Sequence, residues 1–328
     1  MMAGRFTVIL FIFTSSLIGF IMLVRNLDLK REEQSHIEVK NPQEQSDFAM
    51  VHYFLVKEEK PALKLTADTL QLVNNEMMDM TSPRGEAFSE DQIPIYYQSK
   101  IGKMNKLTEV FHLTEAVKMN YKTMELTGHK ASYFKKDDRF EATQNVVSSQ
   151  TSEVNGDKLT IWSDQAVAWP KKQFARYTGR VHGQVDKKKA YEEGISFRSN
   201  ILEADMVQNL ITLREDVFFK KQDFTATSLR AEVFLENYNK KLKYYVLYDD
   251  VKLEQKVLNK DGSVLFRKGF CEKLEGQMLT ETAVLTGAPK IISGTDVVTG
   301  NKITLRERAK LIEVEDNKSS LIIQKGVN

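Results

Sequence analysis

A short phrase recurs between residues 81 and 289: a strand, a polar corner, usually a valine, and then another strand. The last residues of successive copies are separated by 34, 29, 35, 36, 34 and 38 positions. A period near 34 that repeats this often is typical of a stacked array, in which no single unit can bury its own apolar face. The copies are Thr81-Ser82-Pro83, Thr114-Glu115-Ala116-Val117, Thr143-Gln144-Asn145-Val146, Thr178-Gly179-Arg180-Val181, Arg214-Glu215-Asp216-Val217, Tyr248-Asp249-Asp250-Val251 and Thr286-Gly287-Ala288-Pro289.

A small residue opens an alternating apolar run upstream of most of these corners, as in Ala67-Asp68-Thr69-Leu70 and Ala231-Glu232-Val233-Phe234. Period-two alternation buries one face of a strand. The alternative is ordinary β-turn chemistry before valine, but that chemistry does not explain the upstream half of the repeat. No stretch after residue 25 keeps an apolar stripe of helical period for three turns. The sequence therefore predicts an all-β fold of stacked antiparallel strands.

Composition and motifs exclude several classes of function. Forty-seven basic and 45 acidic residues leave a net charge of +2, which gives no electrostatic reason for a nucleic-acid partner. Cys271 is the only cysteine and the five histidines are scattered, so we expect no disulfide and no metal site. The chain carries no phosphate loop, zinc-protease, nucleophile-elbow or dinucleotide motif, so we expect no catalytic residues, no cofactor and no enzyme.

One enzymatic alternative stays open, an anchored carbohydrate-active enzyme, because a glycosidase needs only two carboxylates. Neighbouring acids such as Asp249 and Asp250 point to opposite faces of a strand and do not converge. They are better explained as turn residues and solvated faces.

The N-terminal segment predicts a membrane anchor. Residues 6–24 form an uncharged run of 19 residues after a short basic start at residues 1–5. At 1.5 Å per residue this run spans roughly 28 Å, about one hydrocarbon core. Because no small-x-small cleavage site follows, we expect an uncleaved transmembrane helix, then a flexible tether at residues 25–46. The distribution of Lys and Arg does not by itself fix the orientation.

A stacked β array can fill its interior, leave a groove for an apolar guest, or pair its open edges with another sheet. Many Ala and Thr positions predict room beside the larger side chains, and each buried methylene of a guest gains roughly 0.8 kcal/mol. The alternative is a structural β-solenoid scaffold with a filled core and no lipid ligand. The candidates for a lipid groove are Leu159, Ile161, Val167, Trp169, Val181, Phe197, Val217, Phe219, Val233, Leu235, Val246, Val251, Ile303 and Leu305.

The first half of the array resembles LptC, the periplasmic component of the lipopolysaccharide-export bridge. The anchor and tether are followed by Asp47-Phe48 opening a strand, then by phrases that match one after another. We place an LptC-like jellyroll at residues 47–190. The phrases are Leu65-Thr66-Ala67-Asp68, Met80-Thr81-Ser82-Pro83 with Phe88, Tyr96-Tyr97-Gln98-Ser99-Lys100, Leu113-Thr114-Glu115-Ala116-Val117, Asn155-Gly156-Asp157-Lys158 and Tyr177-Thr178-Gly179-Arg180-Val181.

The second half is similar to the related LptA, or OstA-like, repeat. The nearest phrases are Ala283-Val284-Leu285-Thr286-Gly287-Ala288-Pro289 and Val298-Thr299-Gly300-Asn301-Lys302-Ile303-Thr304-Leu305. An LptC-like chain would stop near residues 185–190, so residues 195–328 make this either an LptC–LptA fusion or an elongated LptC. The polar stretch 186–194 is a boundary between two jellyrolls or a hairpin tip within one.

The resemblance implies an elongated β-jellyroll that stacks edge to edge. Its expected location is the inner membrane, single-pass, with the bulk of the chain in the periplasm. Its expected partners are lipopolysaccharide, an inner-membrane ABC transporter complex that extracts it, and another OstA-like jellyroll bound by edge-strand pairing. The expected edge-strand contacts are Phe48, Val51, Tyr53, Leu55, Leu311, Val314, Leu321 and Ile323.

Overall fold

A computed structural model describes residues 45–57, 59–88, 92–189, 194–221, 224–236, 242–258, 264–306 and 311–315. All of them belong to one compact unit, Gln45–Asn328. The predicted anchor at residues 6–24 and the tether lie outside the described residues. Among the residues that are described, no helix has both the length and the apolar character to cross a membrane.

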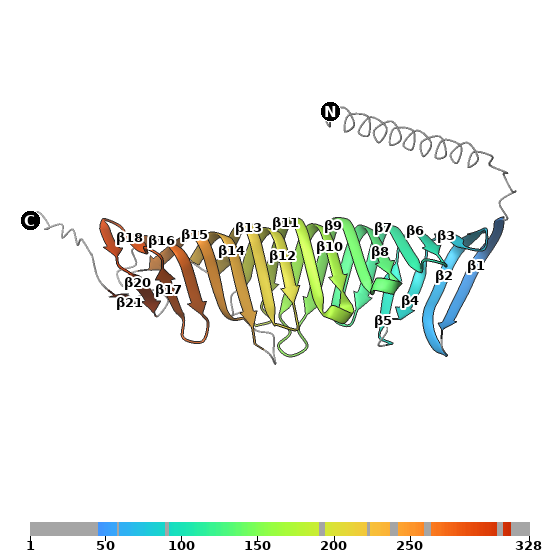
Figure 1. Cartoon of the computed structure of the whole chain (residues 1–328), viewed down its shortest axis with the longest axis horizontal. Helices are drawn as coiled ribbons and strands as arrows, with labels where there is room; N and C mark the ends of the chain where they lie inside the picture. The colour runs from blue at the N-terminus through green and yellow to red at the C-terminus, as the bar shows by residue number, and fades with distance from the viewer. Residues whose placement is uncertain are drawn as a thin grey trace, which may run out of the picture. The chain divides into compact units, whose positions relative to one another are not determined.

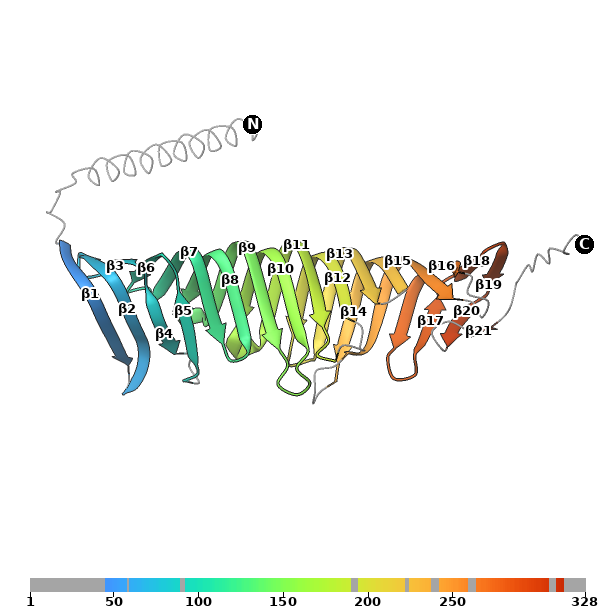
Figure 2. The same ribbon diagram turned by 180° about the vertical axis from the view of Figure 1, so that it is seen from behind.

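The described part is a single antiparallel sheet, as the alternating pattern predicts. In Figures 1 and 2 the sheet runs from the blue β1 at one end to the red β18 to β21 at the other, and from β7 to β16 each strand pairs with its neighbours in the chain. The early strands are β1 (Gln45–Lys57), β2 (Lys60–Val73), β3 (Met77–Thr81), β4 (Arg84–Phe88), β5 (Pro94–Gln98), β6 (Ile101–Asn105), β7 (Val110–Tyr121), β8 (Met124–Phe134), β9 (Arg139–Thr151) and β10 (Lys158–Trp169). The later strands are β11 (Phe174–Asp186), β12 (Ile195–Asp205), β13 (Leu210–Lys221), β14 (Phe224–Leu235), β15 (Leu242–Leu258), β16 (Val264–Gln277), β17 (Thr282–Thr286), β18 (Lys290–Ser293), β19 (Asp296–Thr299), β20 (Lys302–Arg306) and β21 (Leu311–Glu315).

Two single-turn 3-10 helices are the helical elements among the described residues. They are η1 (Lys135–Asp137), between β8 and β9, and η2 (Pro170–Lys172), between β10 and β11. Each ends on a residue with left-handed backbone, Asp138 or Gln173, whose N–H donates back to the first helical carbonyl. They are therefore tight hairpin turns rather than packing elements.

Alternate long strands, among them β7, β11 and β13, bend at a polar corner, and the bends align. The register of neighbouring strands is interrupted between Thr114 and Val117, between Thr178 and Val181, and between Arg214 and Val217. The bends divide the sheet into two arms. Arm 1 contains residues 110–114, 130–134, 166–169, 174–178, 210–214, 231–235 and 242–248, and arm 2 contains residues 94–98, 117–121, 124–128, 146–151, 181–185, 217–221 and 251–258.

The recurring phrases are confirmed as these corners. Six of them place two consecutive residues in the left-handed region, a conformation that favours Gly, Asn and Asp. Gly287 shows the constraint directly, because its φ is +76° and an added Cβ would lie 2.5 Å from Cβ of Glu272. The six pairs are Glu115/Ala116, Gln144/Asn145, Gly179/Arg180, Glu215/Asp216, Asp249/Asp250 and Gly287/Ala288, and Ser82 has the same sign of φ in the shorter phrase.

The bends between these corners are stabilised by serine side chains, a feature that the sequence did not reveal. At three of them a serine hydroxyl donates to the carbonyl oxygen two residues further on. Ser199 is 1% exposed, so the bond satisfies a hydroxyl that would otherwise be buried without a partner. The three bonds are Ser99 to Ile101 at 2.7 Å, Ser199 to Ile201 at 2.9 Å and Ser228 to Arg230 at 3.0 Å.

The core lies between the two arms, where both contribute alternate apolar side chains to one cluster. Val181, Leu274, Leu285, Ile291 and Ile303 are 0% exposed. The strands on either side of the polar stretch 186–194 are hydrogen-bonded neighbours, since β11 pairs with β12 from Phe174↔Asp205 to Val185↔Ile195. The sheet therefore continues past that stretch.

Candidate apolar groove between the arms

Most of the candidate groove residues do line the space between the arms. Val181, Val217, Val251 and Ile303 are at most 1% exposed and belong to the core cluster. Ile161 and Leu305 belong to it as well, and Leu159, Phe197 and Val233 pack against it while partly exposed. Phe219 is buried and reaches the ring of Tyr245 in the core, and the half-buried Leu235 lies opposite Leu242.

Three candidates do not line the interior: Val167, Trp169 and Val246. Ala166 belongs to the core cluster, so alternation places Val167 and Trp169 on the outer face of arm 1. There the Trp169 ring lies 5.7 Å from the Phe174 ring and 5.9 Å from Nζ of Lys172. Val246 lies between the core residues Tyr245 and Leu247 and therefore also points outward. β10 skips one residue of the register, Asp164, and β15 skips Lys243, and each skip shifts the alternation, which explains the wrong assignment.

Aromatic side chains cross the space between the arms at intervals, and of these only Phe219 was among the groove candidates from sequence. Tyr97 of arm 2 meets Phe111 of arm 1 edge to face, with ring centroids 4.8 Å apart. Phe219 of arm 2 stacks on Tyr245 of arm 1, with centroids 5.2 Å apart. The Tyr177 hydroxyl of arm 1 donates to Oγ of Ser148 on arm 2 at 3.1 Å. We call these three contacts the cross-arm contacts.

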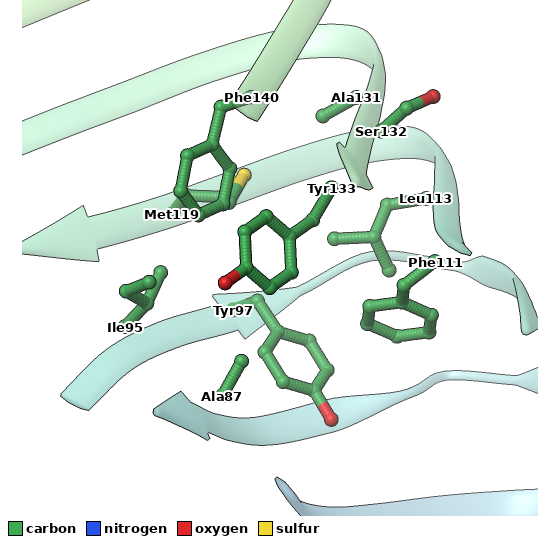
Figure 3. A pocket seen from close by; sticks show the side chains of 10 residues that line it. All are labelled: Ala87, Ile95, Tyr97, Phe111, Leu113, Met119, Ala131, Ser132, Tyr133 and Phe140. Carbon is green, nitrogen blue, oxygen red and sulfur yellow. The ribbon is translucent and has the colours of Figure 1, made fainter. Parts of the chain in front are cut away.

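The interior around the first cross-arm contact is closely packed. Figure 3 shows the rings of Tyr97, Phe111, Tyr133 and Phe140 converging from different strands. The space that they leave is about 10 Å³, room for about one water molecule. Tyr133 and Phe140 stack with centroids 4.3 Å apart, and the Tyr97 hydroxyl donates to the carbonyl oxygen of Lys64 at 3.1 Å. This part of the interior is therefore filled by the protein's own side chains.

A glycine makes room for another large side chain in the middle of the array. An added Cβ at Gly183 would lie 2.1 Å from Cζ of Phe197. The Phe197 ring therefore occupies the volume that any other residue at position 183 would need. The small residue at this position therefore leaves no space for a guest, because the neighbouring strand supplies the side chain that fills it.

The interior is uncharged near the cross-arm contacts. Burial raises the pKa of Tyr97 and of Tyr245 above the usual tyrosine range, so both hydroxyls stay protonated. Burial also raises the pKa of Tyr177, opposed by the hydrogen bond to Ser148, and raises the pKa of the Cys271 thiol to about 12. No cluster of three or more potential metal ligands occurs among the described residues. Such a lining is suited to hydrocarbon rather than to ions.

The predicted edge contacts are distributed over both ends of the sheet. In β1, Phe48 is exposed, whereas Val51, Tyr53 and Leu55 pack partly against the core. In β21, Leu311 is exposed and Val314 packs against the core. Leu321 and Ile323 lie outside the described residues. Among the described strands, β1 pairs with β2 alone and β21 pairs with β20 alone, so both present an unpaired edge.

Comparison with known proteins gives one matching family and 16 matching chains of solved structures. Residues 197–310 match the family described as LptA/(LptD N-terminal domain) LPS transport protein, a family of transport components and not of enzymes. A crystal structure of LptH, the LptA-homologous periplasmic component of the lipopolysaccharide transport device of Pseudomonas aeruginosa, is 16% identical. That match covers 40% of this chain and 89% of LptH, with a TM-score of 0.34. No curated protein matches the chain.

The family match falls within residues 195–328, for which the sequence predicted LptA/OstA-like repeats, and confirms that part of the resemblance. The LptC-like assignment of residues 47–190 stays a prediction, as do the membrane anchor and the periplasmic location.

Proposed function

We propose that this chain is a membrane-anchored periplasmic β-jellyroll that carries lipopolysaccharide, with the acyl chains held between the two arms. The observation that carries the proposal is the apolar interior of residues 197–310, the segment that matches a lipopolysaccharide transport family. Within it Leu202, Leu213, Val217, Leu247 and Val251 are at most 2% exposed. This lining offers hydrocarbon contacts to an acyl chain, and Arg267, 7% exposed, is a buried charged residue within the same segment.

The closed interior adds a mechanical requirement to this proposal. An acyl chain enters only where arm 1 and arm 2 move apart, because Phe219 and Tyr245 occupy the space between them. Each buried methylene gains roughly 0.8 kcal/mol, so a long acyl chain can replace the contacts that one aromatic pair loses. The polar corners let the arms pivot, since the interrupted register there leaves fewer ladder bonds to break.

The direction of transfer follows from the two open edges. We propose that the β1 edge faces an inner-membrane ABC extractor, because β1 follows the predicted anchor at residues 6–24. The β21 edge would then pair with another OstA-like jellyroll, toward the outer membrane. Exposed apolar side chains at both edges, such as Phe54 at 56% and Leu311 at 47%, support pairing with further strands.

A second candidate is a rigid spacer with a filled core and no lipid ligand. The observation that favours it is the cavity of about 10 Å³ beside Tyr97, Phe111 and Tyr133, which admits no acyl chain. The two candidates differ in whether the arms separate when lipid is present.

Binding of fluorescent lipopolysaccharide to the purified full-length chain tests the transport proposal. Val233 and Val167 are matched valines on arm 1, both half-buried, but Val233 faces the interior and Val167 faces outward. We expect Val233→Asp to weaken binding by ~100-fold or more, since a buried carboxylate costs several kcal/mol, and Val167→Asp to bind like the parent chain. Absence of binding by the parent chain would favour the spacer. Equal loss in both variants would show that the interior has no special role.

A further inference from the structure

The outer face of arm 1 carries a hollow that the proposed transport function does not use. It lies over β14, β15 and β16 and has a volume of about 310 Å³. This is at the lower end of the roughly 300–1,000 Å³ that small-molecule sites occupy. The sheet itself separates the hollow from the interior, because Val246 points outward while its neighbours Tyr245 and Leu247 belong to the core.

The register of β15 and β16 produces the shape of the hollow. Tyr244, Val246 and Tyr248 project outward in turn along β15, opposite Gln277, Glu275 and Lys273 of β16. The short valine therefore lies between two tyrosines whose Cα atoms are roughly 13 Å apart, four strand positions. The result is a slot with a short floor and an aromatic wall at each end.

Both aromatic walls are fixed by neighbouring side chains. Phe234 stacks on Tyr244 with ring centroids 4.2 Å apart and an interplanar angle of 12°. The Tyr248 hydroxyl donates to Glu232 at 3.0 Å, and the Arg230 guanidinium lies 4.1 Å from the Tyr248 ring centroid. Partners that fix the rings before a ligand arrives reduce the entropy lost on binding.

The charges around the slot cancel in pairs. Arg230 lies 3.6 Å from Glu232, and Lys273 forms an ion pair with Glu275. No net charge remains to select an anion or a cation. The remaining chemistry is a flat aromatic surface beside a carboxylate, an ammonium and the amide of Gln277, which together donate and accept hydrogen bonds.

This combination fits a sugar ring, which presents an apolar face of C–H groups and a rim of hydroxyls. An acyl chain would cover these polar groups without satisfying them. We propose that the hollow binds a neutral saccharide of one or two rings. The sugar stacks on the face of Tyr244 that Phe234 leaves uncovered, and its hydroxyls bond to Glu275 and Gln277.

Saturation-transfer NMR on the full-length chain tests this site. The protein is kept in lauryldimethylamine oxide, because a maltoside detergent would itself offer sugar rings. The probes are maltose, N,N′-diacetylchitobiose and a sulfated disaccharide. We expect saturation transfer to the ring protons of a neutral disaccharide, with a Kd of about 1 mM, and no tighter binding of the sulfated probe.

Three variants locate the binding. Tyr244→Ala is expected to weaken binding of the disaccharide by ~10-fold, as for loss of an aromatic anchor. Gln277→Trp, at an exposed position, fills the slot and should have the same effect without disturbing the interior. Tyr96→Ala removes a half-exposed tyrosine on arm 2, far in the chain from the slot, and should leave disaccharide binding unchanged.

The proposal is overturned if no neutral disaccharide shows transfer up to solubility, if the sulfated probe binds tighter, or if Gln277→Trp binds like the parent chain. Failure here leaves the transport proposal intact, because lipopolysaccharide binding in the Val233→Asp experiment reports on the opposite face of the sheet.

Discussion

The ring of Phe219 stacks on the ring of Tyr245 and joins the two arms of the sheet, with centroids 5.2 Å apart and an interplanar angle of 28°. The two residues belong to β13 and β15, which are not hydrogen-bonded neighbours but have β14 between them. The contact therefore links the arms through side chains alone. It stabilises the closed interior, and under the proposed function it is also what an entering acyl chain displaces.

Truncating this contact should cost more stability than truncating a matched aromatic pair on the outer face. We expect Phe219→Ala to lower the free energy of unfolding by about 3–5 kcal/mol, because it leaves a cavity in the core. Phe234→Ala, in the half-buried stack with Tyr244, should cost about 1 kcal/mol. Urea unfolding of the full-length chain, followed by far-ultraviolet circular dichroism, measures both. Equal losses would mean that the cross-arm contact is not a core contact.

The corners should respond to substitution according to the sign of φ. Gly287→Ala places a Cβ at φ +76° and within 2.5 Å of Cβ of Glu272, so we expect it to cost more than about 1 kcal/mol. The neighbouring Ala288 already carries a Cβ at φ 51°, and Ala288→Gly should change stability by less than about 1 kcal/mol. The reverse ranking in thermal unfolding would show that Gly287 is not conformationally constrained.

Alkaline pH should destabilise the fold through groups that are buried in their protonated form. The pKa of Cys271 is raised by burial from 9.0 to about 12, so between these values the folded state holds a proton that the unfolded state releases. This contribution is complete below pH 9 and is lost as pH rises toward 12. Burial also raises the pKa of Tyr97 and of Tyr245, so both tyrosines add to the loss of stability at alkaline pH.

Cys271→Ala isolates the thiol contribution. The stability of the parent chain should fall more steeply than that of the variant between pH 9 and pH 11. The folded parent chain should also resist a thiol reagent at pH 8 until denaturant is added, because the buried thiol is protonated. Parallel curves above pH 9, together with rapid labelling at pH 8, would contradict the burial of this thiol.

Edge pairing should depend on the exposed side chains of the terminal strands. Phe54→Lys in β1 and Leu311→Lys in β21 should each weaken self-association by ~10-fold, because an edge lysine opposes addition of a further strand. Tyr96→Lys is the control, since Tyr96 is 50% exposed on β5 but pairs on both sides, with Glu86 of β4 and Asn120 of β7. Sedimentation velocity over a concentration series measures the association. If only the control variant weakened self-association, the contact between chains would lie outside the β1 and β21 edges.

The corners and strands could be predicted from sequence because each obeys a local rule. A pair such as Asp249/Asp250 in the left-handed region requires particular residue types, and alternation around it marks the strands. The facing of side chains was harder, because the one-residue skips at Asp164 of β10 and Lys243 of β15 shift the alternation. Counting from the core alanine Ala166 would have placed Val167 and Trp169 outside.

The filling of the interior could not be predicted from sequence. Whether Tyr245 meets Phe219 depends on how far the sheet bends between the arms, and no local pattern records that angle. Nor does the sequence show that the adjacent strand places the ring of Phe197 over Gly183. The slot beside Tyr244 was missed for a related reason: aromatic residues in an alternating run suggest core until the outer face is known.

Photo-crosslinking in cells that make lipopolysaccharide tests the central claim most directly. A photoreactive residue at Val181, Val217 or Val233 faces the interior, and the same residue at Val167 faces outward from arm 1. We expect lipopolysaccharide adducts at the three interior positions and none at Val167. Adducts with neighbouring protein segments alone at all four positions would contradict it and leave the chain as a spacer between membranes.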